Sequence, residues 1–332
     1  MQDGFLIVDK PPGVTSHDVV AVVRAVTGLK KVGHTGTLDP FATGVLPLAL
    51  GAATRLIQFL DEREKVYDAT LRLGSATDTG DPTGTVVAEA PVPALARARV
   101  QEVLATFVGT RQQVPPRYSA VKVAGRPLYD YARRGEDVAI AARPIEVFGM
   151  ELLDVGTATL RVRIRCSRGT YARVLAEEIG EALGTVAHLE ALRRDASGAF
   201  TLAQSIGMAR IADIVAGDVA WERVLRPSRD GEARVPWRGR DQVRDGLAPW
   251  VIGARDALRH LPAVTVAPLD ARRLRAHGAP PPLPAGVQGP CLLLEGDAIL
   301  AVAHGTSLVP LLHEDGPPDR RGPPRGGRRR NG

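Results

Sequence analysis

The chain has 332 residues, 44% hydrophobic and 24% charged, the balance of a soluble globular protein long enough for one large and one small domain. No apolar run approaches the roughly 18 residues of a membrane span, and the apolar start, residues 5–8, is shorter than the ~7 to 15 residues of a signal-peptide core. The only cysteines, Cys166 and Cys291, provide neither a disulfide framework nor a cysteine metal site, so we expect a cytoplasmic protein.

The N-terminal part is predicted to form a strand over residues 4–8 and a helix over 18–27, with Ser16 as its N-cap and Gly28 at its end. Residues 32–40 are too rich in glycine and turn formers for regular structure, and we expect a loop between core elements, where functional residues often lie.

Further along the chain, strands are predicted over residues 45–50, 66–73, 86–87, 145–153 and 159–166, and helices over 94–108, 128–134 and 170–183. Strands and helices are mixed without a repeating strand-helix-strand unit, so the α+β class is favoured over a doubly wound sheet.

The C-terminal part has three regions. Residues 227–249 are basic and poorly periodic and suggest a loop or linker, whereas 261–312 contain short apolar strands typical of a small β-rich domain. The Pro/Gly/Arg tract from Gly316 onward is of low complexity, and we expect it to be disordered. That tract carries +5 of the net charge of +6, which leaves the body of the protein close to neutral.

Two local clusters nevertheless suggest a nucleic-acid partner. Residues 111–134 combine six basic residues with three tyrosines, and such mixtures bind phosphates and stack on bases. In the second cluster, strand alternation places Arg161, Arg163 and Arg165 on one face, as a row of arginines facing water. A solvated surface explains either cluster equally simply.

Asp39 is the most notable candidate for chemistry, because it lies beside His34 on the glycine-rich loop; Asp-Pro is also a common turn element. The seven histidines show no metal-ligand spacing, and we expect no metal. The sequence has no glycine-rich phosphate loop and no nucleophile elbow, so nucleotide hydrolysis and hydride transfer are disfavoured.

Several segments together resemble one family, in its order and at about its spacing. They are Asp9-Lys10-Pro11-Pro12-Gly13, the block from Gly33 to Pro47 (GHTGTLDPFATGVLP), Lys65-Val66-Tyr67, Thr77-Asp78-Thr79, Ser167 to Arg173 (SRGTYAR) and Leu192-Arg193-Arg194. The chain is similar here to the TruB-type pseudouridine synthases, and the resemblance covers roughly residues 4–202. It implies the pseudouridine synthase fold, a mixed and mainly antiparallel sheet flanked by helices, with a small C-terminal PUA-like β-domain.

The resemblance implies a tRNA pseudouridine synthase that isomerises the uridine at position 55 of the T-loop by base flipping, without a cofactor. Asp39, Tyr67 and Arg173 are its expected catalytic residues, with Arg173 pairing with Asp39. His34, Tyr171 and Leu192 are expected to bind the substrate together with Tyr67, whose hydroxyl is also expected to help remove the C5 proton. Lys10 and Pro11 are expected to support the catalytic loop.

By the same resemblance, residues 1–255 form the catalytic domain, 256–314 the PUA-like domain and 315–332 a disordered arginine-rich tail. A thumb insertion at about 111–143 clamps the RNA, with backbone contacts from Arg117, Lys122 and Arg126. The expected partner is the tRNA T-arm, bound by a monomer without a membrane or an obligatory protein partner. Two alternatives remain: an RNA-guided enzyme acting on ribosomal RNA, and a non-catalytic RNA-binding or tRNA-folding chaperone.

Overall fold

A computed structural model describes residues 3–225, 236–278, 281, 287, 289–304 and 307–311. The chain divides into two compact units, Met1–His260 and Leu261–Gly332. The boundary between the units lies after His260, whereas the sequence analysis placed the domain boundary after residue 255.

The first unit is built on one large sheet of eleven strands. Along the main path the order is β14-β1-β3-β12-β4-β11-β10-β7, while β13, β15 and β2 pair with β12, β1 and β3. The strands are β1 (Gly4–Lys10), β2 (Val32–His34), β3 (Thr43–Leu50), β4 (Glu64–Leu73), β7 (Gly109–Gln113), β10 (Arg143–Val155), β11 (Thr159–Ser167), β12 (Ala187–Ser197), β13 (Phe200–Thr201), β14 (Ile206–Gly207) and β15 (Val251–Gly253). Among these described strands only the β1–β14 and β3–β12 pairs are parallel, which confirms the mainly antiparallel α+β class.

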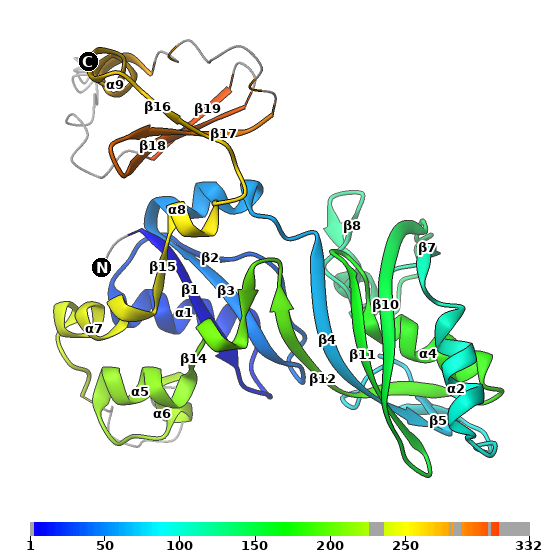
Figure 1. Ribbon diagram of the computed structural model, residues 1–332. Helices are drawn as coiled ribbons and strands as arrows, with labels where there is room; N and C mark the ends of the chain where they lie inside the picture. The colour runs from blue at the N-terminus through cyan, green and yellow to red at the C-terminus, as the bar shows by residue number, and fades with distance from the viewer. Residues whose placement is uncertain are drawn as a thin grey trace, which may run out of the picture. The chain divides into compact units, whose positions relative to one another are not determined.

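Helices cover the sheet in two groups, one near β1 and β3 and one near β10 and β12 (Figure 1). The first group contains α1 (Ser16–Thr27), α5 (Met208–Ala216), α6 (Trp221–Leu225) and α7 (Arg240–Leu247), and the second contains α2 (Arg97–Ala105) and α4 (Ala172–Ala182). Shorter elements are α8 (Ala254–Ala257) and the 3-10 helices η1 (Gly51–Phe59), η2 (Leu202–Gln204) and η3 (Ala248–Trp250).

Helix α1 begins at Ser16, two residues earlier than predicted. Its N-cap is Thr15, whose side chain accepts a hydrogen bond from the Asp18 backbone while Asp18 bonds back, and Gly28 ends it in a left-handed conformation. Ser16 is a buried first-turn residue and not the cap. Its hydroxyl is used elsewhere, as described below.

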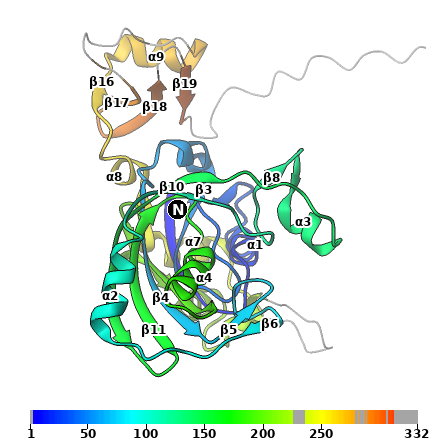
Figure 2. The same ribbon diagram turned by 90° about the vertical axis from the view of Figure 1, so that its right-hand side faces the viewer.

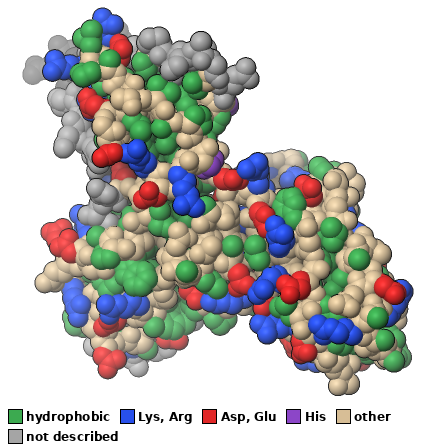
Figure 3. Space-filling model, in the orientation of Figure 1, with side chains coloured by type: hydrophobic (Ala, Val, Ile, Leu, Met, Phe, Trp, Pro, Cys, Tyr) green, Lys and Arg blue, Asp and Glu red, His purple; other side chains and the backbone are tan. Residues whose placement is uncertain are grey.

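The central strand β4 carries polar side chains on its buried face as well as on its exposed face, whereas those of β11 lie on the exposed face. On β4 every second residue is buried, and these include Lys65 and Tyr67. On β11 the arginines face outward as predicted, but each pairs with a carboxylate: Arg161 with Asp68, Arg163 with Asp195 and Glu151, and Arg165 with Glu64. The expected row of free arginines is therefore a charge-balanced surface, and on the face drawn in Figure 3 basic and acidic side chains are likewise interspersed.

Two excursions leave the sheet of the first unit. One is the hairpin β5 (Ser75–Thr77) and β6 (Val86–Glu89). The other contains β8 (Lys122–Val123), β9 (Arg126–Pro127) and α3 (Leu128–Arg133), and it stands apart from the sheet in Figure 2. We call this segment the thumb and restrict it to residues 114–142. Residues 111–113 of the predicted insertion belong to β7, and residue 143 is the first residue of β10.

The predicted linker over 227–249 contains a regular helix, so that prediction was wrong for its second half. Helix α7 spans Arg240–Leu247 and buries Val243 and Leu247 in the main core. Two hydrophobic positions four residues apart on a short polar helix gave too weak a pattern to recognise in the sequence. Residues 226–235 lie outside the described part.

The second unit is the small β-rich domain that its short apolar runs predicted. Strands β16 (Ala263–Thr265), β17 (Cys291–Glu295), β18 (Ala298–His304) and β19 (Ser307–Pro310) form a four-stranded sheet in this order, with β16 parallel to β17. Helix α9 (Pro268–His277) packs Ala271 and Leu274 into its core. The arginine-rich tail lies outside the described residues.

Candidate active site

Asp39 lies on the loop between β2 and β3, and the backbone of this loop is held on both sides of the carboxylate. The Ser16 hydroxyl donates to the Leu38 carbonyl (3.1 Å) and accepts from the Leu38 amide (2.9 Å). On the other side, the Pro40 carbonyl accepts from the Lys10 ammonium (3.2 Å) and from the Gly13 amide (2.8 Å). These contacts fix where Asp39 points.

Lys10 is fully buried and supports this loop, as the sequence suggested. Its Nζ also donates to the carbonyls of Pro11 (2.9 Å) and Val14 (2.8 Å), so three carbonyls share one ammonium. Burial lowers the pKa of Lys10 to about 8, and the negative charge of Asp39 opposes that shift.

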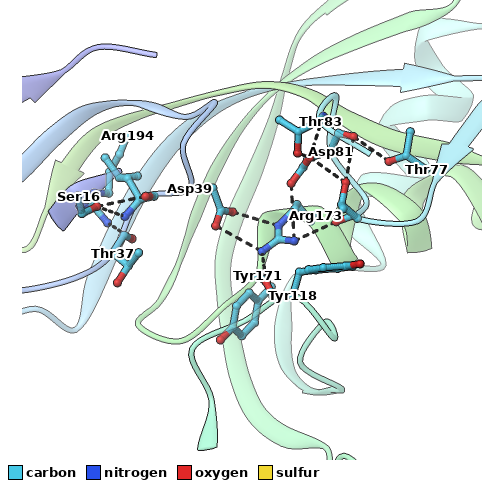
Figure 4. A network of polar contacts seen from close by, with 12 residues as sticks. Ser16, Thr37, Asp39, Thr77, Asp81, Thr83, Tyr118, Tyr171, Arg173 and Arg194 are labelled. Carbon is cyan, nitrogen blue, oxygen red and sulfur yellow. Dashed lines mark hydrogen bonds and ion pairs between the residues drawn. The ribbon is translucent and has the colours of Figure 1, made fainter. Parts of the chain in front are cut away.

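Arg173 pairs with Asp39, and the two side chains meet across the site (Figure 4). Arg173 Nε lies 3.0 Å from Asp39 Oδ2, and Nη2 donates to Oδ1 at 3.4 Å. Burial raises the pKa of the Asp39 carboxyl, and the Arg173 charge works against this by favouring the carboxylate. The arginine is 4% exposed and the aspartate 34%, so the carboxylate is the partner that substrate can reach.

Arg173 is itself held by three further acceptors. It donates to the carbonyls of Thr79 and Tyr118, both at 2.9 Å, and its Nη1 lies 3.7 Å from Asp81 Oδ2. Asp81 Oδ1 is occupied by Thr79 and Thr83, which leaves Oδ2 facing the arginine (Figure 4). The orientation of Arg173 is thus set by the turn after β5 and by the thumb, because Tyr118 belongs to the thumb.

A cavity of about 540 Å³ opens beside Asp39, a size within the range of about 300–1,000 Å³ typical of small-molecule sites. Its walls combine loop, sheet and helix residues, and five of the predicted site residues are among them: Asp39, Tyr67, Tyr171, Arg173 and Leu192. These residues come from β4, β12, the start of α4 and the 35–42 loop, which are far apart in sequence.

His34 does not line this cavity. It precedes Thr35, which does, and its ring meets the ring of His17 edge to face with centroids 5.3 Å apart. Burial is the main reason that the pKa of His34 is lowered.

Tyr67 is buried in the cavity wall, opposite Arg194 in the pairing of β4 with β12. Burial raises the pKa of its phenol, while the charge of Arg194 and a hydrogen bond from it act in the opposite direction. The side chain thus offers an aromatic face and a hydroxyl that a guanidinium can stabilise if it loses its proton.

Sequence reasoning gave no role to Arg194, which is 1% exposed and ties the loop that carries Asp39 to the sheet. Its guanidinium donates to the carbonyls of Val45 (2.7 Å), Gly36 (3.1 Å) and Thr37 (3.4 Å). The available signal was its place in the Leu192-Arg193-Arg194 segment that resembles the family, two residues after Leu192.

Two other lining residues, Lys65 and Glu62, were also missed. They form a buried pair with 3.1 Å between Nζ and Oε1, and Glu62 also accepts from the hydroxyls of Thr35 and Ser197. The spacing of Lys65 and Tyr67 on one strand face was the signal that places both at the site.

The three residues predicted to contact the RNA backbone lie on or beside the thumb, and none of them lines the cavity. Arg117 pairs with Asp137 (2.8 Å), and Arg126 pairs with Glu136 and stacks over Tyr131. Lys122 is exposed and has no partner within the described residues.

Over the part of the chain that the structure describes, no cluster of three or more histidine, cysteine or acidic residues is arranged to hold a metal ion. The same residues contain no helix long and apolar enough to cross a membrane.

Residues 24–172 match the model of the TruB family pseudouridylate synthase N-terminal domain, and residues 173–229 match that of the tRNA pseudouridylate synthase B C-terminal domain. The fold is similar to that of a chain in the crystal structure of a Cbf5-Nop10-Gar1 complex, with a TM-score of 0.63, 29% identity and coverage of 91% of this chain and 78% of that one. The two family models and the fold therefore define a pseudouridylate synthase.

Curated relatives identify the branch. The tRNA pseudouridine synthase B of Geobacter sulfurreducens is 42% identical over 94% of this chain and 96% of its own length. That of Geobacillus thermodenitrificans is 42% identical over 88% of this chain and 91% of its own. The chain belongs to the TruB family.

Proposed function

We propose that this chain is a tRNA pseudouridine synthase that isomerises the uridine at position 55 of the T-loop. The observation that carries the proposal is the Asp39–Arg173 pair, placed on a cavity whose other walls include two tyrosines and a leucine. A base that has left its stack needs an aromatic face and an enclosed pocket, and this cavity provides both.

The reaction breaks the N1–C1′ glycosidic bond, turns the uracil and joins C5 to C1′; the C5 proton is lost and N1 gains one. No atom is added and no electron is transferred, so the reaction requires no cofactor. The Asp39 carboxylate, kept ionised by Arg173, acts as the nucleophile on the ribose or the base, or as the base that removes a ribose proton.

The surrounding residues divide the remaining work. Tyr67, Tyr171 and Leu192 enclose the uracil. The Tyr67 hydroxyl first gives its proton to water, and the resulting phenolate, which Arg194 stabilises, takes the C5 proton and becomes a phenol again. His34 lies outside the cavity and next to the loop that carries Asp39. When the RNA is bound, its side chain enters the T-loop and fills the position that the flipped nucleotide has left. The thumb residues Arg117, Lys122 and Arg126 contact the RNA backbone; Lys122 has the best support, because the two arginines already have acidic partners.

We further propose that the second unit is a PUA-like RNA-binding domain and that the arginine-rich tail adds affinity. The protein works as a cytoplasmic monomer on the tRNA T-arm, without an obligatory protein partner. Both cysteines are buried and unpaired, as suits a reducing compartment.

An RNA-guided enzyme is the main alternative, since the solved relative is in a complex with Nop10 and Gar1. The tRNA pseudouridine synthase B relatives match with higher identity, which favours tRNA.

The test is to incubate the purified full-length protein with an unmodified tRNA transcript and to map pseudouridine along the strand. We expect one modified position, in the T-loop, without guide RNA or added protein. A tRNA that binds and stays unmodified would support the chaperone alternative.

A further inference from the structure

Four arginines line the cavity, and they fall into two kinds. Arg173 and Arg194 are buried and fully engaged in holding Asp39 and its loop. Arg143 and Arg168 are exposed, and within the described residues the side chain of neither has a hydrogen-bond or ion-pair partner. The rim of the cavity therefore carries two guanidinium groups without a counter-ion.

Free arginines are unusual in this part of the fold. Arg161, Arg163 and Arg165 on β11 all have carboxylate partners, and Arg165 is only three residues from Arg168. Because the neighbouring arginines are paired with carboxylates, the two unpaired guanidinium groups are not the result of a general excess of arginine. Both of them line the cavity.

The backbone presents both arginines at one rim. Ser167 to Thr170 form a turn in which the Thr170 amide donates to the Ser167 carbonyl (3.4 Å), and Gly169 supplies the left-handed φ of 84° that such a turn needs at its third position. Arg168 is the second residue of this turn. Arg143 begins β10, whose Glu146 amide donates to the Ser167 hydroxyl (2.9 Å), so the two strand ends are joined.

A second cavity, of about 850 Å³, shares Arg168 but has a different character. Its other charged residues are Asp61, Arg63, Glu64 and Glu146, three of them acidic. Two of these carboxylates are already paired, Asp61 with Arg63 and Glu64 with Arg165, so among the described lining residues Arg168 is the one cation left unpaired here. The cavity that contains Asp39 is lined by both Arg143 and Arg168 and can therefore offer two guanidinium groups to a phosphate backbone.

We propose that Arg143 and Arg168 bind backbone phosphates next to the nucleotide whose base enters the cavity. This inference rests on the proposed function, because it takes the ligand to be a flipped nucleotide. A guanidinium matches a phosphate through two parallel hydrogen bonds, and holding the flanking backbone keeps the base out of its stack. Near the site, these two arginines then contribute to the affinity for RNA, in addition to the contacts that the thumb makes.

The experiment measures affinity for an unmodified T-arm hairpin over a range of salt concentrations. Every variant is made in the Asp39→Asn background, so that bound RNA is not consumed. Arg143→Ala and Arg168→Ala should each weaken binding by about three- to tenfold and flatten the slope of log K against log salt by about 0.7 to 0.9. Arg143→Lys and Arg168→Lys keep the charge and should retain most of the slope.

Arg165→Ala is the matched control, because it removes a nearby arginine that is paired with Glu64, and its slope should equal that of the parent. All replaced side chains are exposed, so thermal unfolding midpoints should stay within a few degrees of the parent. Slopes for Arg143→Ala and Arg168→Ala that match Arg165→Ala would overturn the inference. The proposed function is judged separately, by pseudouridine formation with Asp39 intact, so either idea can fail alone.

Discussion

Lys10 is a single side chain that supports the loop carrying Asp39. Its ammonium serves three buried carbonyls, one of them next to Asp39. We expect Lys10→Met to lower kcat more than it raises KM, because the loop loses its support while the cavity walls stay intact. The loss of donors to buried carbonyls should destabilise the fold by about 1–3 kcal/mol.

The pH dependence of stability gives this residue a second test. The pKa of Lys10 is lowered to about 8 from an ordinary value of 10.5, so between these values the unfolded chain holds a proton that the folded chain has released. The free energy of unfolding must then rise with pH across this window, by at most about 3 kcal/mol from this group. Urea unfolding at pH 7.5 and 10 should show wild type gaining stability relative to Lys10→Met; an equal change in both proteins would refute the assignment.

The two possible roles of Tyr67, stacking and proton transfer, can be distinguished by removing its hydroxyl oxygen. If the residue only stacks, Tyr67→Phe should be nearly as active as wild type, and Tyr67→Ala should lose about 1–3 kcal/mol. We expect instead that Tyr67→Phe slows the loss of the C5 proton. Because burial raises the pKa of the phenol, this step in wild type should accelerate as pH rises through the alkaline range, and Tyr67→Phe should lack that acceleration.

The measurement is single-turnover kinetics of both proteins on tRNA with protium or deuterium at uracil C5. A slow Tyr67→Phe with an enlarged isotope effect supports the proton-transfer role. Near wild-type turnover without an isotope effect would leave stacking alone.

At the scale of elements, β7 and α4 are joined by one buried side chain. Gln113, 2% exposed, donates to the Tyr171 carbonyl (3.1 Å) and accepts from the Tyr171 amide (2.8 Å). It lies where β7 leads into the thumb, and Tyr171 caps the helix that carries Arg173. The start of the thumb and the helix that carries Arg173 are therefore attached to each other through Gln113.

We expect Gln113→Ala to lower kcat by about tenfold or more, because α4 can then shift and misplace Arg173 relative to Asp39. Gln113→Glu keeps the acceptor and removes the donor, so its activity should be intermediate. Thermal unfolding of each variant gives the accompanying loss of stability. Wild-type kcat in a folded Gln113→Ala would show that this contact does not position the site.

The elements themselves were largely predictable, because strand alternation and helix periodicity are local. Strands β1, β3, β4, β6, β10 and β11 and helices α1 to α4 lie near their expected positions, but no strand was predicted over β12, which carries Leu192 and Arg194. The features that escaped prediction depend on contacts between residues distant in sequence. Ser16 was predicted to cap the helix because its hydrogen bonds to Leu38, 22 residues away, cannot be recognised in the sequence. Gln113 follows no local pattern, and its partner Tyr171 is also distant in sequence. The β11 arginines were assigned to the correct face. Their partners come from β4, β10 and β12 and depend on how these strands are arranged, which the sequence does not reveal.

The candidate site was predictable only in part, and for a different reason. Asp39, Tyr67, Tyr171, Arg173 and Leu192 were expected from the family resemblance, and the structure brings them to one cavity. The residues that support them, Arg194, Lys65 and Glu62, were given no role. Arg194 and Lys65 lie in segments that resemble the family, but a buried charged side chain in a strand looks like a solvent-facing one until the strand's neighbours are known. Glu62 lies outside the helices and strands and follows no local pattern.

At the scale of the whole molecule, charge is distributed very unevenly. Residues 316–332 carry six arginines and one acid, while the rest of the chain is close to neutral. Arginines in such a tract contact phosphates rather than base edges, so the tail should add affinity without choosing the uridine.

Deleting residues 316–332 should therefore flatten the slope of log K against log salt by about 0.7 to 0.9 for each phosphate that the tail neutralises in the intact protein. The modified position should stay the same, which pseudouridine mapping would check. If the truncated protein modifies other uridines, the tail takes part in choosing the site.

We propose that the Asp39 carboxylate starts the chemistry on the uridine, and that Tyr67 acts only later, when the C5 proton is lost. Tritium release from tRNA labelled at uracil C5 tests it most directly, with wild type compared with Asp39→Asn. The amide keeps the shape of the side chain and loses its nucleophilicity and basicity, so tRNA should bind within about a few fold of wild type while release falls below about 1%. Release by Asp39→Asn well above that level, with reversion of Asn to Asp excluded, would contradict the account.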